Sequence, residues 1–169
     1  MTSALTAICD LITRVAKLFI GALVGAIVVI TLAAVWWRYV INAPLAWPEQ
    51  VSRIMFVWVT FIGAAVLYRE RLHVAIDMFV AVLPQAGRRI FGWAVELAIL
   101  AFNIILLIFG LKLSLDTLDQ TFGALDITPA SFYFAAPVAA AMMILYFIEG
   151  IATRDRRAAI DVHAGASTS

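Results

Sequence analysis

Four long apolar stretches separated by short polar connections dominate the chain. Residues 18–37, 51–68, 90–111 and 130–151 are each predominantly apolar. A helix rises about 1.5 Å per residue, so each stretch is long enough to cross a hydrocarbon core of about 30 Å. The apolar residues are too continuous for barrel strands, in which hydrophobic positions alternate. The pattern therefore predicts an all-α membrane protein with four transmembrane helices.

With their flanking residues, the helices are expected at about 15–41, 48–69, 88–118 and 129–152, in a single integral-membrane domain over residues 1–153. The first stretch is longer than the roughly 7–15 apolar residues of a signal peptide and ends in "VWWRYV" instead of small residues, so we expect it to be retained. Residues 154–169 end in "HAGASTS" and are expected to form a disordered cytoplasmic tail.

Composition supports the membrane assignment. The chain is 64% hydrophobic and 14% charged, whereas a soluble domain is about 45–50% apolar and about 25% charged. The net charge is only +1, and the basic residues lie at the ends of the apolar segments, which argues against a nucleic-acid partner. Cys9 is the single cysteine, so it forms no internal disulfide.

The distribution of Lys and Arg predicts the orientation. Basic residues precede the first helix, bracket the second connection and follow the fourth helix: Arg14, Lys17, Arg69, Arg71, Arg88, Arg89, Arg154, Arg156 and Arg157. The first connection has only Arg38, and the third sets Lys112 against three aspartates. By the positive-inside rule, both termini and the second connection are cytoplasmic.

The second connection contains a shorter apolar run, residues 72–83, that cannot span the membrane. His73 and Asp77 lie four residues apart, on one side of an otherwise apolar helix that Pro84 would end. We predict an amphipathic helix at the cytoplasmic interface, in contact with lipid headgroups. A re-entrant or buried connector is the alternative.

The sequence lacks the groups that enzyme chemistry needs. Its only histidines are His73 and His163, too few and too far from the helix centres to ligate a haem within the chain. The His73 and Asp77 pair is too small a set for a metal site, and no nucleophile motif or phosphate loop occurs. We therefore predict no enzyme activity, no cofactor and no metal.

Glu96 and the glycines are the notable features within the spans. Glu96 should face protein and not lipid, either as a proton or ion site or as a buried acid that is bonded to a neighbouring helix or protonated. Gly21 and Gly25 lie four residues apart, a spacing that lets helix backbones approach closely, and Gly63 is a further helix-packing candidate. The partner helix belongs either to this chain or to another subunit.

The second helix begins with an acid and a base. Trp47 suits the headgroup level, Pro48 fits the first helical turn, and Glu49 complements the helix dipole. Arg53 lies one turn deeper, in the order that favours an ion pair with Glu49. We expect this pair to face protein or an outer aqueous vestibule. A snorkelling arginine with an intrahelical partner is the alternative.

The segment "RYVINAPLAWPEQVSRIMFVWVTFIGAAVLYRERLHVAIDMFVAVLP" resembles the small membrane subunit of tripartite ATP-independent periplasmic (TRAP) transporters. The family's pattern is matched by Arg38, Tyr39, Trp47, Glu49, Phe56, Trp58, Phe61, Gly63, His73 and Asp77, and later by Pro129, Tyr133 and Pro137. Gln50 departs from it, because a second acid is frequent there. The resemblance covers about residues 13–151.

The resemblance implies a non-catalytic subunit with two protein partners. In that family a large membrane subunit, a separate chain, holds the ion and substrate sites and moves one of its domains as an elevator, while a periplasmic binding protein delivers a small organic acid. The small subunit enlarges the static scaffold, and an ion gradient, commonly Na⁺, drives this symport. Arg38, Trp47, Glu49, Arg53 and Trp58 are the candidate contacts with these partners.

A membrane-anchor subunit of a respiratory or dehydrogenase complex is the alternative function. It would require a redox partner, and the histidine count already disfavours haem. The transported substrate is not encoded in a recognisable way in this chain, since in the family it is recognised by the other two components.

Overall fold

The computed structural model describes residues 2–70, 85–121 and 126–166, and it describes side chains for residues 4–70, 92–121 and 126–153. Every regular element among the described residues is helical. The helices are α1 (Thr2–Tyr39), α2 (Trp47–Arg69), α4 (Gln85–Asp116), the single-turn α5 (Ala130–Tyr133) and α6 (Ala135–Ala166). The all-α prediction is therefore confirmed.

Four helical segments are long and apolar enough to cross a membrane: Ala4–Tyr39, Trp47–Arg69, Gly92–Asp116 and Ala130–Thr153. These correspond to the four predicted spans. The chain is thus a multi-pass membrane protein by length and composition of its helices. The interfacial helix expected at 72–83 lies outside the described residues.

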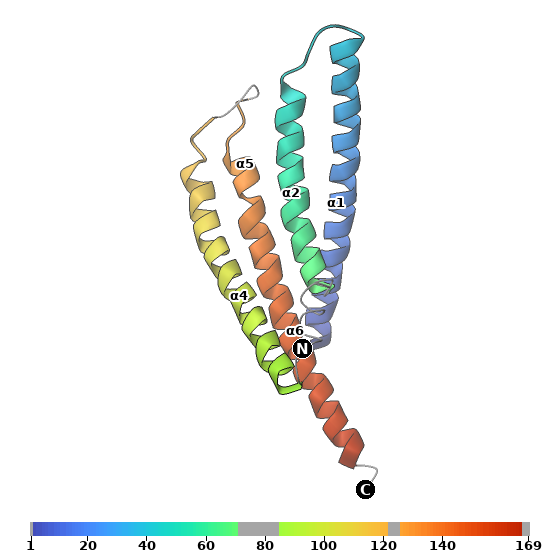
Figure 1. Cartoon of the computed structure of the whole chain (residues 1–169), viewed down its shortest axis with the longest axis vertical. Helices are drawn as coiled ribbons and strands as arrows, with labels where there is room; N and C mark the ends of the chain where they lie inside the picture. The colour runs from blue at the N-terminus through green and yellow to red at the C-terminus, as the bar shows by residue number, and fades with distance from the viewer. Residues whose placement is uncertain (1, 71–84, 122–125, 167–169) are drawn as a thin grey trace.

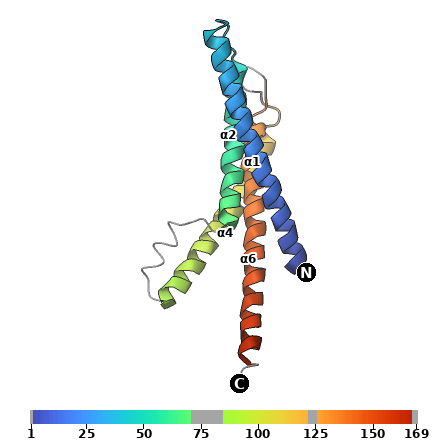
Figure 2. The same cartoon turned by 90° about the vertical axis from the view of Figure 1, so that its right-hand side faces the viewer.

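The helices are arranged in the order α1, α2, α6, α4, with α1 also touching α6 (Figure 1). Among the described residues, α4 packs on α5 and α6 but contacts neither α1 nor α2. The lower part of α4 diverges from α6 in the perpendicular view (Figure 2). The molecule is therefore an open array with α1 and α4 at its edges, not a closed four-helix bundle.

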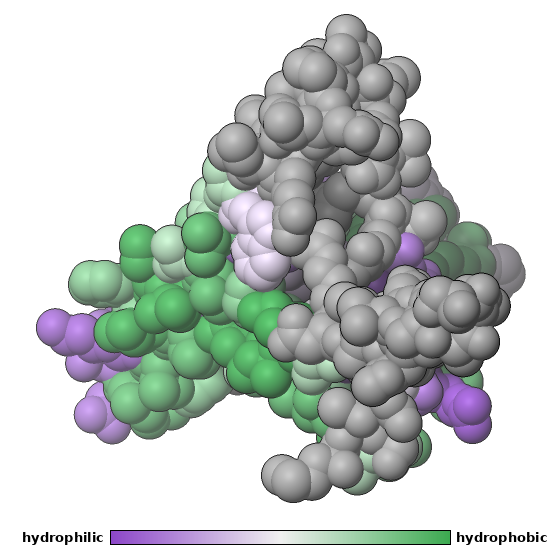
Figure 3. All heavy atoms as spheres, turned by 90° about the horizontal axis from the view of Figure 1, so that it is seen from below, coloured by the Kyte–Doolittle hydropathy of each residue, from purple (hydrophilic) through white to green (hydrophobic). Residues whose placement is uncertain are grey.

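Large apolar side chains remain exposed along both edge helices. They include Leu18, Val29 and Leu32 on α1 and Phe102, Ile105 and Phe109 on α4. Seen from the end that carries the termini, hydrophobic atoms make up most of the coloured surface (Figure 3). Such a surface is stable only against lipid or another apolar protein surface.

The first helix is longer than the sequence predicted. It begins at Thr2, not near residue 15, because Leu5, Cys9, Ile12 and Ala16 recur at helical spacing on the side that packs against α2 and α6. At the other end of the chain, α6 continues to Ala166, into the range where a disordered tail was expected. Arg and Ala, which favour helices, are frequent there.

The hydrogen bonding of the fourth span is interrupted near its start. Pro137 has no N–H to donate to the carbonyl of Tyr133, so the helix lacks this hydrogen bond at Phe134, between α5 and α6, where the backbone stays helical. Opposite this interruption, a Cβ built on Gly110 of α4 would lie 3.2 Å from Cδ of Pro137. Only glycine allows α4 and α6 to approach this closely without displacement.

The start of α1, the end of α2, the start of α4 and the end of α6 lie toward the same end of the molecule (Figure 1). This is the arrangement required if they share one side of the membrane. That this side is the cytoplasm stays a prediction, based on the basic residues.

Candidate functional site: a polar network joining three helices

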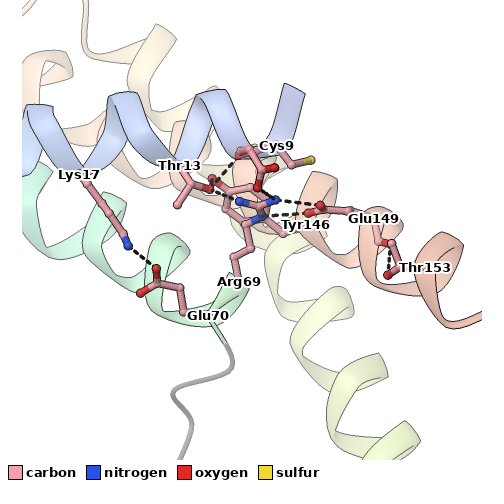
Figure 4. A network of polar contacts seen from close by, with 9 residues as sticks. Cys9, Thr13, Lys17, Arg69, Glu70, Tyr146, Glu149 and Thr153 are labelled. Carbon is pink, nitrogen blue, oxygen red and sulfur yellow. Dashed lines mark hydrogen bonds and ion pairs between the residues drawn. The ribbon is translucent and has the colours of Figure 1, made fainter. Parts of the chain in front are cut away.

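Arg69, the last residue of α2, connects three helices (Figure 4). Its Nε donates to Oε2 of Glu149 at 2.9 Å, and Nη2 donates to Oε1 of the same carboxylate at 2.8 Å. Nη2 also donates to Oδ1 of Asp10 at 2.7 Å, and Nη1 donates to Oγ1 of Thr13 at 2.9 Å. One guanidinium therefore links α2 to both α1 and α6.

The bond between Arg69 and Glu149 is a two-pronged, largely buried ion pair. The side chains are only 16% and 10% exposed. Charges removed from water at this depth are stable only when they are paired and fully hydrogen-bonded. The planar fork of arginine matches a carboxylate in this bidentate geometry, which lysine does not provide.

Thr13 and Tyr146 complete the network. The Thr13 hydroxyl donates to the carbonyl oxygen of Cys9 at 2.8 Å and lies 3.0 Å from the Tyr146 hydroxyl. A threonine has a single hydroxyl proton, so Tyr146 must be the donor in the second bond. The Arg69 guanidinium carbon also lies 5.4 Å from the centre of the Tyr146 ring, within cation–π range.

A second ion pair adjoins the network on its exposed side. Lys17 of α1 binds Glu70, the residue after α2, and both side chains are partly exposed to solvent. Glu70 also caps α2 with its backbone N–H. Two consecutive residues thus attach the end of α2 to α1, at the point where the chain enters the 71–84 connection.

The network is suited to holding helices together and not to catalysis. Its hydroxyls, carboxylates and guanidinium bind one another, so none is left as an activated nucleophile or base. No group of three or more His, Cys, Asp and Glu side chains placed to hold a metal occurs among the described residues.

The predicted pair at the start of α2 forms at the opposite end of the molecule. Nη2 of Arg53 lies 3.0 Å from Oε1 of Glu49, and their side chains are 62% and 81% exposed. Arg38 and Trp47 are exposed at the same end. What these residues contact in the membrane stays a prediction.

Trp58 differs from the other candidate contacts because it serves packing within the chain. Its Nε1 donates to the carbonyl oxygen of Ser131 in α5 at 2.8 Å, and its ring meets Phe19 of α1 edge to face. Its only donor is therefore used inside the protein.

The glycine candidates do not mediate close helix contacts within the described chain. A Cβ built on Gly21, Gly25 or Gly63 would meet nothing within 4 Å. No described helix of this chain approaches the Gly21 and Gly25 pair closely, and contact with a helix of another subunit stays a prediction. Glu96 is partly buried on α4, and His73 and Asp77 lie outside the described residues.

Sequence reasoning did not identify the Arg69 network. Arg69 was interpreted only as a topology signal, and Glu149 was not considered. The signal that identifies both is an acid inside an apolar span, which needs a partner, together with an arginine predicted at the same membrane edge. The pairing joins residues 80 positions apart, so only the tertiary structure reveals it.

Comparison with known proteins places the chain in a transporter family. A family model described as "Tripartite ATP-independent periplasmic transporters, DctQ component" matches residues 27–157. The sialic acid TRAP transporter small permease protein SiaQ of Vibrio cholerae is 21% identical over 141 residues, covering 83% of this chain and 82% of that protein.

Two further relatives are matched over part of their length. The C4-dicarboxylate TRAP transporter small permease protein DctQ of Vibrio cholerae is 28% identical over 92 residues, covering 54% of this chain and 40% of that protein. The sialic acid TRAP transporter permease protein SiaT of Haemophilus influenzae is 29% identical over 129 residues, covering 76% of this chain. The chain spans 21% of the length of SiaT.

The family match extends over most of the four helical spans and includes Glu149 and Arg69. Transporter membrane subunits are not an enzyme class, which agrees with the interpretation of the polar network as structural. The match and the helical architecture together show that the chain belongs to the DctQ-component family, the small membrane subunits of TRAP transporters.

Proposed function

We propose that this chain extends and braces the static scaffold of a separate, large elevator-type subunit in a TRAP-type secondary transporter of a bacterial inner membrane. Its termini are on the cytoplasmic side. The observation that carries the proposal is the open helix array, in which the Arg69 network ties α1, α2 and α6 together while α1 and α4 expose apolar flanks.

A scaffold must stay fixed relative to lipid while another domain moves. An open array is wider than a closed bundle of the same helices, and its apolar flanks resist leaving the hydrocarbon layer. The buried ion pair favours rigidity because separating the helices would expose an unpaired charge to a poorly solvated environment. These properties suit a bracing subunit.

The described residues do not supply a transport site of their own. Among the described residues, the buried polar side chains Thr13, Asn103, Ser114, Thr117 and Glu149 each form a hydrogen bond within the chain. The buried side-chain atoms without a partner are two neutral oxygens on different helices, Oδ1 of Asn103 and Oγ of Ser131. We therefore assign the ion and substrate sites to the large subunit. The relatives' names mention sialic acid and C4-dicarboxylate, so we propose uptake of a small organic acid, driven by an ion gradient, commonly Na⁺.

The outer end of the array is the proposed contact surface for the periplasmic binding protein and the large subunit. Arg38, Trp47, Glu49 and Arg53 form this surface, and we leave out Trp58 because its donor is used internally. An exposed ion pair contributes only about 0–1 kcal/mol to folding. A strong functional effect of Arg53 would therefore report contact with a partner.

The proposal is tested by assembly and transport. The tagged full-length chain, expressed with its large subunit, is expected to co-purify with it. The two together, with the binding protein, are expected to catalyse gradient-driven uptake in proteoliposomes. Removing this chain should abolish or strongly reduce uptake. Uptake by this chain alone, or full uptake without it, would overturn the assignment.

The contact surface is tested by a matched pair of arginines. Arg53→Ala removes an exposed arginine at the outer end, and Arg14→Ala removes an exposed arginine at the opposite end. Arg53→Ala is expected to lower uptake by the three-part system several-fold, with Arg14→Ala close to wild type. Equal, small effects would refute a special role for the outer surface.

A further inference from the structure

We propose that two polar bonds, Trp58 to Ser131 and Arg69 to Glu149, set the register of α6 against α2, and that either bond alone suffices. The proposal concerns the subunit's own fold and does not depend on a transport partner. It starts from the surface between these two helices, which run in the same direction (Figure 1).

Small residues lie among larger ones on the α2–α6 surface, where Phe61 and Tyr68 of α2 and Met142 and Tyr146 of α6 belong to the same cluster or pack against it. Ala65 of α2 and Ala139 of α6 belong to one fully buried cluster, and Ala135, one turn before Ala139, is also fully buried. The alanines present nearly the same shape at each turn, so these positions alone do not select one register. In lipid no hydrophobic force selects the register that buries most area, because the tails are as apolar as the side chains.

The two polar bonds lie at opposite ends of this surface. Trp58 donates to the Ser131 carbonyl at 2.8 Å near the outer end, and Arg69 holds the Glu149 carboxylate at 2.8 and 2.9 Å near the other end (Figure 4). A slip of one helical turn moves α6 by about 5.4 Å. That displacement exceeds the length of either hydrogen bond and would break both.

Each bond is strongly selective for one register. A buried charge left without its partner is unfavourable in a poorly solvated environment. Fixing a register is a well-attested use of buried polar groups. The Ser131 carbonyl belongs to the single turn α5, so the indole N–H also fixes the start of the fourth span. The two bonds constrain the same relative position of the helices independently.

The register is read by disulfide crosslinking of the full-length chain in membranes. In a Cys9→Ala background, Ala65→Cys is combined with Ala139→Cys for the native register. Ala65→Cys is also combined with Ala135→Cys or with Met143→Cys, and crosslinking of these pairs reports a slip of α6 by one turn in one direction or the other. The first pair is expected to crosslink several-fold faster than the other two.

Two conservative changes then remove the bonds. Trp58→Phe keeps an aromatic ring without the donor, and Arg69→Gln removes the charge. Each single variant is expected to keep the native preference. In the double variant, the crosslinking rates of the two displaced cysteine pairs should come within about twofold of the rate of the native pair. Trp58→Phe with Arg53→Gln, which alters an exposed ion pair, is the matched control and should keep the preference.

A double variant that keeps the native preference would overturn the proposal, because packing alone would then set the register. A displaced pattern in either single variant would also overturn it, since one bond would not suffice. If the Arg69→Gln chain is not recovered from membranes, Glu149→Gln takes its place in the same comparison.

Discussion

Replacing Arg69 with methionine is the most direct perturbation of the polar network. Methionine has a similar length and a good helix propensity, so the change removes the charge and its hydrogen bonds with little effect on α2 itself. It leaves the Glu149 carboxylate, whose side chain is only 10% exposed, without its partner. Asp10 is 61% exposed and is hydrated by water instead.

The expected cost follows from this burial. Removing one member of a buried ion pair typically destabilises a protein by about 3–5 kcal/mol, because the remaining charge is uncompensated. For a chain of this size, about 1 kcal/mol corresponds to roughly 2–4 °C, so the melting temperature should fall by about 6–20 °C. Replacing both Arg69 and Glu149 with methionine should restore most of this loss, since an apolar pair needs no partner.

Thermal unfolding of the purified chain in detergent, followed by circular dichroism, measures these changes. Arg53→Met is the matched control, because its ion pair is exposed and contributes only about 0.2–1 kcal/mol. The reasoning is refuted if Arg69→Met costs no more than Arg53→Met, or if the Arg69 and Glu149 double variant is no more stable than Arg69→Met alone.

Three further predictions concern the helix contacts. Gly110→Ala should destabilise the chain by about 1–3 kcal/mol in the same unfolding assay, because the added Cβ meets Cδ of Pro137 at 3.2 Å; Gly21→Ala, which meets nothing within 4 Å, is its control and should be neutral or stabilising. Asn103→Leu should be neutral or raise the melting temperature, because Asn103 is 3% exposed and its Oδ1 has no hydrogen-bond partner; a marked decrease would contradict this. Gly21→Leu should lower co-purification with the large subunit without changing the stability of the isolated chain, and unchanged co-purification would argue against an inter-subunit role for the α1 glycines.

The start of α2 shows how far local sequence reasoning reaches. The predicted helix start near residue 48 and the ion pair between Glu49 and Arg53 are both present, because each depends on residues within one helical turn. The start of α1 was predicted too late, since residues before 15 are less apolar and become helical by packing on α2 and α6. Contacts from distant segments are not visible in a local pattern.

The same distinction applies to the polar groups. Trp58 was expected to face a partner protein, but its N–H binds Ser131, 73 positions away in the chain. Gly21 and Gly25 have the spacing of a helix contact, yet no described side chain of this protein approaches them. Spacing along one helix shows which residues share a face, but not which helix lies opposite that face.

The sequence by itself determined that this protein is helical, that it has four spans, and to which family it is similar. The helical character and the number of spans depend on the hydrophobicity and length of continuous segments, which a bilayer tests one segment at a time. The family similarity depends on the motif residues themselves. Only the tertiary structure decided the open order of α1, α2, α6 and α4 and the role of Arg69. Those depend on which helix faces meet, and a buried charge reveals its purpose only when its distant partner is known.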